Sequence, residues 1–342
     1  MLPLLLAAAV LVPPSADAVL SIEDVSGLRA LLEKAGTHAP SLGPQPIGAT
    51  LQDRLGVDLL SEPPEWGLAS RGPRQLVFSR DGLGLAAPVR DPGAARKMLA
   101  AWLGQKPGRR AGRIAGARLL TASGANPAAV LTAMSRPTSL PAPLAAQAKG
   151  PVWLWMRLDV PLRAVVLSIG ASGAGLTGRG LVTADDAVLA GTAPSGCAEG
   201  IACLRAGVAP AGRRAIALVL GRLGFSPQEE LAAAARVEER LEGGNPHALA
   251  DGRSFPRATR IEAVFDAAPS EGAALEITVW LATVENLLSA LTPLDALRGP
   301  LAAGAYATHL LYGPLLRNAG PLTLTGNPRG NGAELELRLP LR

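Results

Sequence analysis

The sequence is poor in the residue types that most often carry chemistry. Its 342 residues include two cysteines and three histidines, and aromatic residues make up 3% of the chain. Two cysteines are too few for a disulfide-dense small domain or for a multi-cysteine zinc or iron–sulfur site. The histidines (His38, His247 and His309) lie far apart in sequence, which disfavours a histidine metal centre. We therefore expect no metal and no cofactor.

Motifs of enzymes and nucleotide-binding proteins are also missing. Residues 170–175 read Gly-Ala-Ser-Gly-Ala-Gly, which matches neither the Gly-x-Ser-x-Gly nucleophile elbow nor the Gly-x-Gly-x-x-Gly or Walker A phosphate loops. Asp185 and Asp186 are adjacent carboxylates in an expected turn, and neighbouring strand residues point to opposite faces. The sequence predicts a protein that is not an enzyme, and a hydrolase without a recognisable motif is the weaker alternative.

One basic cluster stands out against a small net charge of +5. Proteins that bind single-stranded nucleic acid place aromatic stacking platforms beside such charges, and this cluster has none, so we expect no nucleic-acid partner. It is typical of a solvated loop, and an anionic lipid or polysaccharide is the partner that its charge suits. The cluster consists of Lys106, Arg109, Arg110, Arg113 and Arg118.

The N-terminal residues predict export. Residues 2–12 form an apolar run that is too short to span a bilayer as a helix but fits the central region of a signal peptide. Ala16-Asp17-Ala18 is a small-x-small cleavage site, although no Lys or Arg precedes the run. The alternative is a buried first element of a cytoplasmic fold. We expect residues 1–18 to be a signal peptide, the protein to be periplasmic or extracellular, and the mature chain to lack a transmembrane helix.

The two cysteines fit an oxidising compartment. Cys197 and Cys203 enclose five residues, and the glycines around them give the loop the freedom to bring the two Cα atoms within bridging range. Export makes oxidation available, so the sequence predicts a Cys197–Cys203 disulfide. The alternative is two unpaired thiols.

Local patterns indicate strands in hairpins, followed by helices. Residues 75–79 and 83–89 are strand candidates around the turn Asp81-Gly82, and Asp91-Pro92 is typical of a helix start. Residues 136–150 are rich in proline and alanine and read as a linker. They divide the mature chain into a first half, 19–135, and a second half, 151–342.

The second half repeats this theme. Asp159-Val-Pro-Leu-Arg-Ala resembles Asp24-Val-Ser-Gly-Leu-Arg-Ala, which predicts a helix from each aspartate. We expect hairpins from residues 176–182 with 187–193, from 260–265 with 274–281, and from 322–325 with 334–339. The predicted fold is α+β, with antiparallel hairpins, helices packed on one sheet face, and two related halves.

Two aromatic clusters are candidates to face a ligand. Trp153 and Trp155 lie on one face of the expected strand 152–158, and ordinary sheet core is the alternative. Tyr306, His309 and Tyr312 recur at three-residue spacing on one helical face, and an amphipathic helix packed on the sheet is the alternative.

Several short stretches resemble a family of exported bacterial proteins of unknown function. They are Val12-Pro-Pro-Ser-Ala-Asp-Ala-Val-Leu, Gly56-Val-Asp-Leu-Leu, Gly72-Pro-Arg-Gln-Leu, the Pro-Val-Arg-Asp-Pro stretch ending at Pro92, and the C-terminal hairpin. The resemblance implies an extracytoplasmic α+β protein and supplies no catalytic residues.

Together these observations favour an exported cell-envelope protein with a non-enzymatic binding or structural role, whose partner is an envelope protein or an apolar ligand. The alternative is a periplasmic carrier of an apolar ligand such as a lipid. A cavity of several hundred Å³ with apolar walls would favour the carrier.

Overall fold

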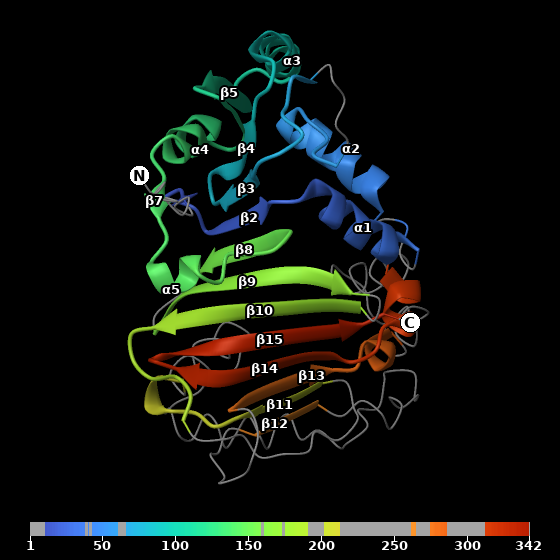
Figure 1. The fold of residues 1–342 in the computed structure, drawn as a ribbon, viewed down its shortest axis with the longest axis vertical. Coiled ribbons are helices and arrows are strands. Elements are labelled where there is room, and N and C mark those ends of the chain that lie inside the picture. The colour runs from blue at the N-terminus through green and yellow to red at the C-terminus, as the bar shows by residue number, and fades with distance from the viewer. Residues whose placement is uncertain are drawn as a thin grey trace, which may run out of the picture. The chain divides into compact units, whose positions relative to one another are not determined.

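The computed structural model describes residues 11–37, 40, 43–60, 66–158, 161–172, 175–190, 202–212, 261–264, 274–285 and 312–341 (Figure 1). The chain forms two compact units. The first comprises residues 1–36, 42–157 and 165–170, and the second comprises 37–41, 158–164 and 171–342. Each is built on a largely antiparallel sheet, which confirms the α+β class.

The first unit contains a sheet in the strand order β9-β8-β2-β3-β4-β6-β5. Its central strand β2 pairs antiparallel with β3 and β8, so that Ala18 lies opposite both Phe78 and Met156. The strands are β2 (Ala18–Ile22), β3 (Arg74–Ser79), β4 (Gly82–Pro88), β5 (Arg110–Ala115), β6 (Arg118–Gly124), β8 (Val152–Arg157) and β9 (Leu162–Ser172).

The expected linker 136–150 lies inside this unit. It contributes β7 (Thr138–Ser139), which pairs with β1 (Leu11–Val12), and α5 (Ala142–Ala145). The chain leaves this unit after β8, whose backbone is hydrogen-bonded to β2, and residues 165–170 of β9 belong to it again.

The predicted β3–β4 hairpin and the helix after it are both confirmed. Arg80 and Asp81 make the turn, one residue earlier than the predicted Asp81-Gly82, because Gly82 already pairs with Ser79 as the first residue of β4. Gly82 packs so closely against β6 that a side chain would collide with the Ser123 carbonyl. Helix α3 (Pro92–Gln105) begins at Asp91, whose Oδ1 accepts hydrogen bonds from the backbone N–H groups of Gly93 and Ala94 at 2.8 and 3.1 Å. Local capping and turn chemistry therefore determine this segment.

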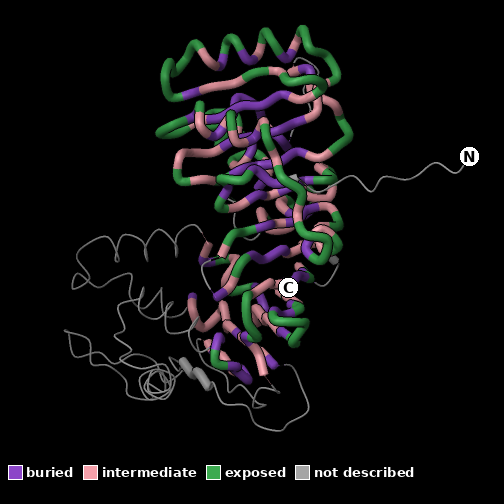
Figure 2. Tube along the Cα trace, turned by 90° about the vertical axis from the view of Figure 1, so that its left-hand side faces the viewer, coloured by how far each residue is buried: buried purple, intermediate pink, exposed green. Residues whose placement is uncertain are grey.

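Helices cover both faces of the first sheet. On one face α1 (Val25–Gly36), α2 (Pro44–Leu55) and α3 pack over a core that includes Leu85, which is 0% exposed. Gly84, the neighbour of Leu85, faces Val130 and Met134 of α4 (Pro127–Met134) on the other side. The helices were expected on one face only; alternation along β4 gives it two apolar faces. Figure 2 shows largely buried strands and exposed outer helix turns.

Residues 11–17 are built into the first unit. Asp17 donates its backbone N–H to Phe78 at 2.9 Å and accepts hydrogen bonds from the backbone N–H groups of Arg157 and Arg80. Val12 and Ala16 are 3% and 0% exposed. The predicted cleavage site at residues 16–18 therefore coincides with packed structure at the start of β2, and processing itself stays a prediction.

The second unit contains a sheet in the order β12-β11-β13-β14-β15-β10. All neighbours are antiparallel except β11 and β12, which run parallel. The strands are β10 (Gly175–Ala184), β11 (Ala202–Ala206), β12 (Ile261–Val264), β13 (Leu275–Val279), β14 (Leu322–Arg329) and β15 (Gly332–Pro340). The C-terminal hairpin β14–β15 was predicted and is confirmed.

Three expectations for the second half are wrong. The helix predicted from Asp159 is replaced by the long strand β9, in which the β-branched Val165 and Val166 are buried. Strand β10 pairs with the distant β15 instead of forming a hairpin with 187–193. Strands β12 and β13 both pair with β11, not with each other. The two similar segments, which begin at Asp24 and Asp159, therefore lead into different elements, the helix α1 and the strand β9.

Within the described part of the chain, no helix has both the length and the apolar character that crossing a bilayer requires.

Candidate ligand-binding cleft

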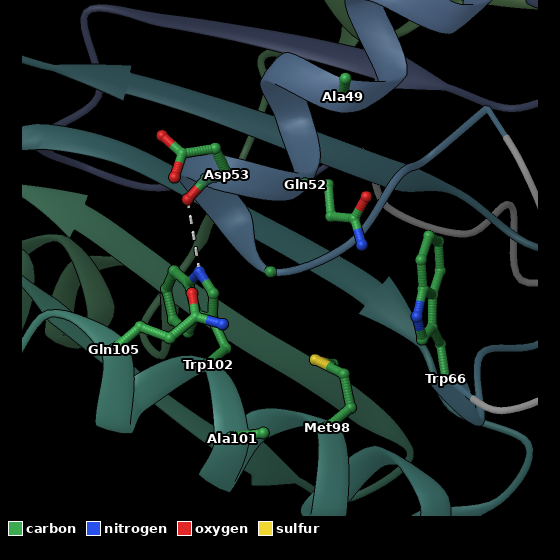
Figure 3. Close-up of a pocket in the computed structure, with 9 residues that line it drawn as sticks. Ala49, Gln52, Asp53, Trp66, Met98, Ala101, Trp102 and Gln105 are labelled. Carbon is green, nitrogen blue, oxygen red and sulfur yellow. Dashed lines mark hydrogen bonds between the residues drawn. The ribbon is translucent and has the colours of Figure 1, made fainter.

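A cleft of about 400 Å³ lies between helices α2 and α3 of the first unit (Figure 3). Each helix contributes residues at spacings of three, four and seven, which places them on one helical face. The half-buried Trp66 adds a further wall from the segment before β3. The contributions are Ala49, Gln52, Asp53 and Gly56 from α2 and the residue after it, and Met98, Ala101, Trp102 and Gln105 from α3.

Small residues keep the two helical faces from filling the space between them. Packed helices normally interdigitate large side chains, but Ala49, Gly56 and Ala101 leave this position hollow. Gly56 ends α2 with a φ of 87°, and a Cβ there would come within 2.8 Å of the Trp102 ring. Glycine is therefore required both by the backbone conformation and by the close approach of the indole.

The Trp102 side chain forms the inner wall and is held from two sides. It is 4% exposed, and its indole N–H points to the backbone oxygen of Asp53 at 3.5 Å, the interaction drawn in Figure 3. The guanidinium of Arg110 lies 4.8 Å from the ring centroid, within the range of a cation–π contact. The ring is thus fixed before any ligand arrives.

Arg110 ties the ends of the two helices together from strand β5. Its Nη1 donates to the backbone oxygen of Trp102 at 2.8 Å and to Gln105 Oε1 at 2.7 Å, and its Nη2 donates to the backbone oxygen of Asp53 at 2.7 Å. Carbonyls in the last turn of a helix have no partner within the helix. One buried guanidinium supplies partners for both helices, and so positions both walls of the cleft.

Among the residues that the structure describes, Asp53 is the one charged residue in the lining of the cleft, and cations lie around it. The Lys106 ammonium lies 3.1 Å from Asp53 Oδ1, and its hydrogen bond and charge, followed by the charges of Arg110 and Arg54, hold the pKa of Asp53 below its usual value. Asp53 is therefore ionised near neutral pH, yet three cations surround this single carboxylate.

A second hollow, of about 660 Å³, lies at the start of α1. Its charged side chains are Glu23, Asp24, Arg29 and Arg71, two of each sign, so it has no preference for ligand charge. A hydrogen bond from the Ser26 hydroxyl, followed by one from the Gly27 backbone, lowers the pKa of Asp24. These bonds belong to the start of the helix.

The predicted ligand-facing tryptophans lie in the sheet core. Trp153 and Trp155 are 2% and 6% exposed, and neither lines the two hollows described above. The indole N–H of Trp153 donates to Glu23 Oε1 at 3.0 Å. Both rings therefore serve packing in β8.

The remaining predicted site residues are described only in part. Tyr312 is half-buried in a helical segment at 312–318, whereas Tyr306 and His309 lie outside the described residues. Cys203 is buried in β11 and is not a free thiol. Cys197 also lies outside the described residues, so the pairing of the two cysteines stays a prediction. Within the described ranges, no group of three or more His, Cys, Asp and Glu side chains could hold a metal ion.

The apolar residues of α3 around Trp102 recur at helical spacing, a pattern that is typical of core and does not by itself reveal a cleft. These residues do pack on the sheet, and Leu99 and Trp102 are buried. The sequence does contain two helical faces that each combine small residues with a glutamine, Gln52 in α2 and Gln105 in α3. No local pattern, however, shows that the two helices face each other.

Comparison with known proteins adds little. No family model and no curated protein matches the sequence, so the family resemblance stated above stays a prediction. Among solved structures, crystal forms I, III and IV of TP0453 are similar at 12%, 13% and 13% identity, with TM-scores of 0.31, 0.30 and 0.29. These matches cover 53%, 51% and 49% of this chain and 82%, 78% and 76% of the other.

Proposed function

We propose that this protein is a non-enzymatic binding protein of the cell envelope, and that the cleft between α2 and α3 holds a small ligand with a flat apolar face. One observation carries the proposal: Trp66 and Trp102 stand on opposite sides of the cleft with Met98 between them (Figure 3). Ligand sites of this volume are typically lined by apolar and aromatic side chains with a few polar groups that orient the ligand.

The polar rim supports an amphipathic ligand over a wholly apolar one. Gln52, Asp53 and Gln105 are exposed at the cleft, and the cleft opens to solvent. A lipid chain enclosed by the protein would need walls without such groups. A ligand that places one face on Trp66, above the buried Trp102, and keeps its polar part in water fits the lining residues better.

The assignment to the envelope rests on the sequence, namely the apolar run 2–12 and the small-x-small site at 16–18. Fractionation of cells that express the full chain tests it. Export predicts protein in the periplasm or medium with a shortened N-terminus by mass spectrometry. Recovery of the intact N-terminus in the cytosol would contradict export.

Filling the cleft tests the binding function. Ala101 is an exposed residue of α3 that lines the cleft, and Ala100 beside it is exposed outside the cleft, so the two form a matched pair. The probe is 1-anilinonaphthalene-8-sulfonate, a flat apolar anion whose fluorescence rises on binding. We expect Ala101→Trp to abolish the cleft-dependent signal and Ala100→Trp to retain it. Equal binding by the two variants would refute the proposed site.

A further inference from the structure

We infer that the cleft between α2 and α3 recognises an acidic saccharide, a sugar ring that carries a carboxylate. The inference rests on the proposed binding function and adds the chemical class of the ligand. It draws on three features: the charge around the cleft, the free hydrogen-bonding groups at its rim, and the aromatic walls.

Positive charge is concentrated in the part of the chain that forms one side of the cleft. Between Asp91 and Asp159 the sequence contains ten Lys and Arg residues and no Asp or Glu. Six of the ten lie in α3, β5 and the turn between them, and the other four lie in β6 or later in the chain. Such a one-signed region raises the local concentration of anions and speeds their association. A cationic ligand would be repelled, although tryptophan walls alone would favour it.

Lys106 provides a cation at the rim that a ligand carboxylate can reach. Its side chain is 55% exposed. Its Nζ lies 3.1 Å from Oδ1 of Asp53, which holds the ammonium beside the cleft. An ammonium carries three N–H donors, and a single aspartate does not use all of them. The ammonium is therefore positioned by the protein while donors remain for a ligand.

The rim also offers paired donors and acceptors that suit hydroxyl groups. Gln105 Oε1 accepts from Arg110 at 2.7 Å, so the amide group of Gln105 is left to donate. Gln52, on the opposite helix, has an exposed amide that can donate and accept. A planar aromatic acid would use the tryptophans and Lys106 but neither amide. A sugar acid uses all of them, because its hydroxyl groups surround the ring.

The half-buried Trp66 is the wall that fits the apolar face of a sugar ring, while the 4% exposed Trp102 lines the inner end of the cleft. The C–H groups on one face of a pyranose form a flat surface that packs against an indole, while the hydroxyl groups project outward to the rim. The open side of the cleft lets neighbouring sugar units extend into solvent.

Calorimetry with the full chain tests the inference. The probes are trigalacturonate and maltotriose, a neutral α-1,4-linked trisaccharide of the same length, with 1-naphthoate as an aromatic acid that lacks hydroxyl groups. We expect trigalacturonate to bind about tenfold more tightly than maltotriose at low salt, and the difference to shrink as salt screens the charges. Tighter binding of 1-naphthoate than of trigalacturonate, or equal affinity for the two saccharides, would overturn the inference.

Variants locate the binding. We expect Lys106→Gln to weaken trigalacturonate binding about fivefold and to leave maltotriose binding unchanged. Lys97→Gln, an exposed α3 residue outside the lining, is the matched control. We expect Trp66→Ala to weaken binding of both saccharides about tenfold, whereas Trp66→Phe retains a stacking face. Equal effects of the two lysine variants would overturn the role of Lys106.

The outcomes separate this inference from the proposed function. If neither saccharide binds while the naphthalene probe still depends on Ala101, the cleft is a binding site for another class of ligand and only the inference fails. If the naphthalene probe also ignores Ala101→Trp, the proposed function fails with it.

Discussion

The two units differ in net charge, and among the residues that the structure describes the largest fully buried side chains lie mostly in the first unit. The first unit contains 17 Lys and Arg against 10 Asp and Glu, a net charge of +7, and the second contains 16 against 18, a net charge of −2. Of the twelve largest fully buried side chains in the described residues, eleven belong to the first unit and only Cys203 to the second. Four of the five tryptophans also lie in the first unit.

The cleft of the first unit lies above a closely packed core. Leu55, Leu59, Leu85 and Leu119 are all 0% exposed beneath the helices that form the walls. Because the core beneath α2 and α3 is closely packed, the two helices cannot move inward. The space beside their small residues therefore stays empty. The charge difference then makes the same unit the one that attracts anions.

The largest expected effect comes from opening a cavity in that core. We expect Leu85→Ala to lower the free energy of unfolding of the first unit by about 3–5 kcal/mol. Leu324→Ala, a half-buried position of β14 in the second unit, should cost about 1 kcal/mol. Urea unfolding followed by tryptophan fluorescence reports the first unit, where most tryptophans lie. Equal costs at the two positions would break the comparison.

Removal of residues 11–17 is expected to destabilise the first unit by about 2–4 kcal/mol, because several backbone and side-chain hydrogen bonds of roughly 1 kcal/mol each are lost. Among them are the Asp17 bonds to Phe78, Arg80 and Arg157. Chains that begin at Leu11 and at Ala18 should differ by this amount in thermal unfolding. Hydrogen exchange in β14 should stay the same. Identical stability of the two chains would show that the packed segment is dispensable.

Arg110→Leu is expected to cost about 2–3 kcal/mol, since it leaves carbonyls of α2 and α3 without their charged donor. Arg163→Leu in the second unit removes an exposed ion pair with Asp185 and should cost under about 1 kcal/mol. Chemical denaturation measures both. Because Arg110 also positions Trp102, its loss should weaken binding of the naphthalene probe, and unchanged probe binding would contradict its positioning role.

The smallest effect concerns pH. Lys106 lowers the pKa of Asp53 in the folded protein, so the stability from this pair is present above the ordinary carboxyl pKa of 3.8 and is lost as pH falls through the lowered value. We expect Asp53→Asn to flatten the decline in urea midpoint on acidification, with little change near pH 7. Asp24, whose pKa is lowered by Ser26, contributes in the same direction. An unchanged acid profile in Asp53→Asn would contradict the pairing.

Short-range features were predicted well. The β3–β4 hairpin, the helix from Asp91-Pro92 and the C-terminal hairpin depend on turn and cap residues that act within a few positions, although the first turn lies one residue before the predicted Asp81-Gly82. The partners of β10 and β13 were not predictable, because strand pairing joins residues more than a hundred positions apart in the first case and is selected by packing in both. The helix predicted from Asp159 was wrong because its pattern fits a buried strand equally well.

The sequence by itself determined the absence of recognisable enzyme motifs, the clustering of positive charge around Lys106 and Arg110, and the local turns and caps. All of these depend only on composition and on residues a few positions apart. Only the tertiary structure decided that Trp153 and Trp155 are core, and that the stripes of α2 and α3 face each other across a cleft. Whether a side chain is buried or lines a cavity depends on which elements pack against each other. The same helical pattern is compatible with many such packings. The small residues Ala49, Gly56 and Ala101 acquire their meaning from the element that lies opposite them.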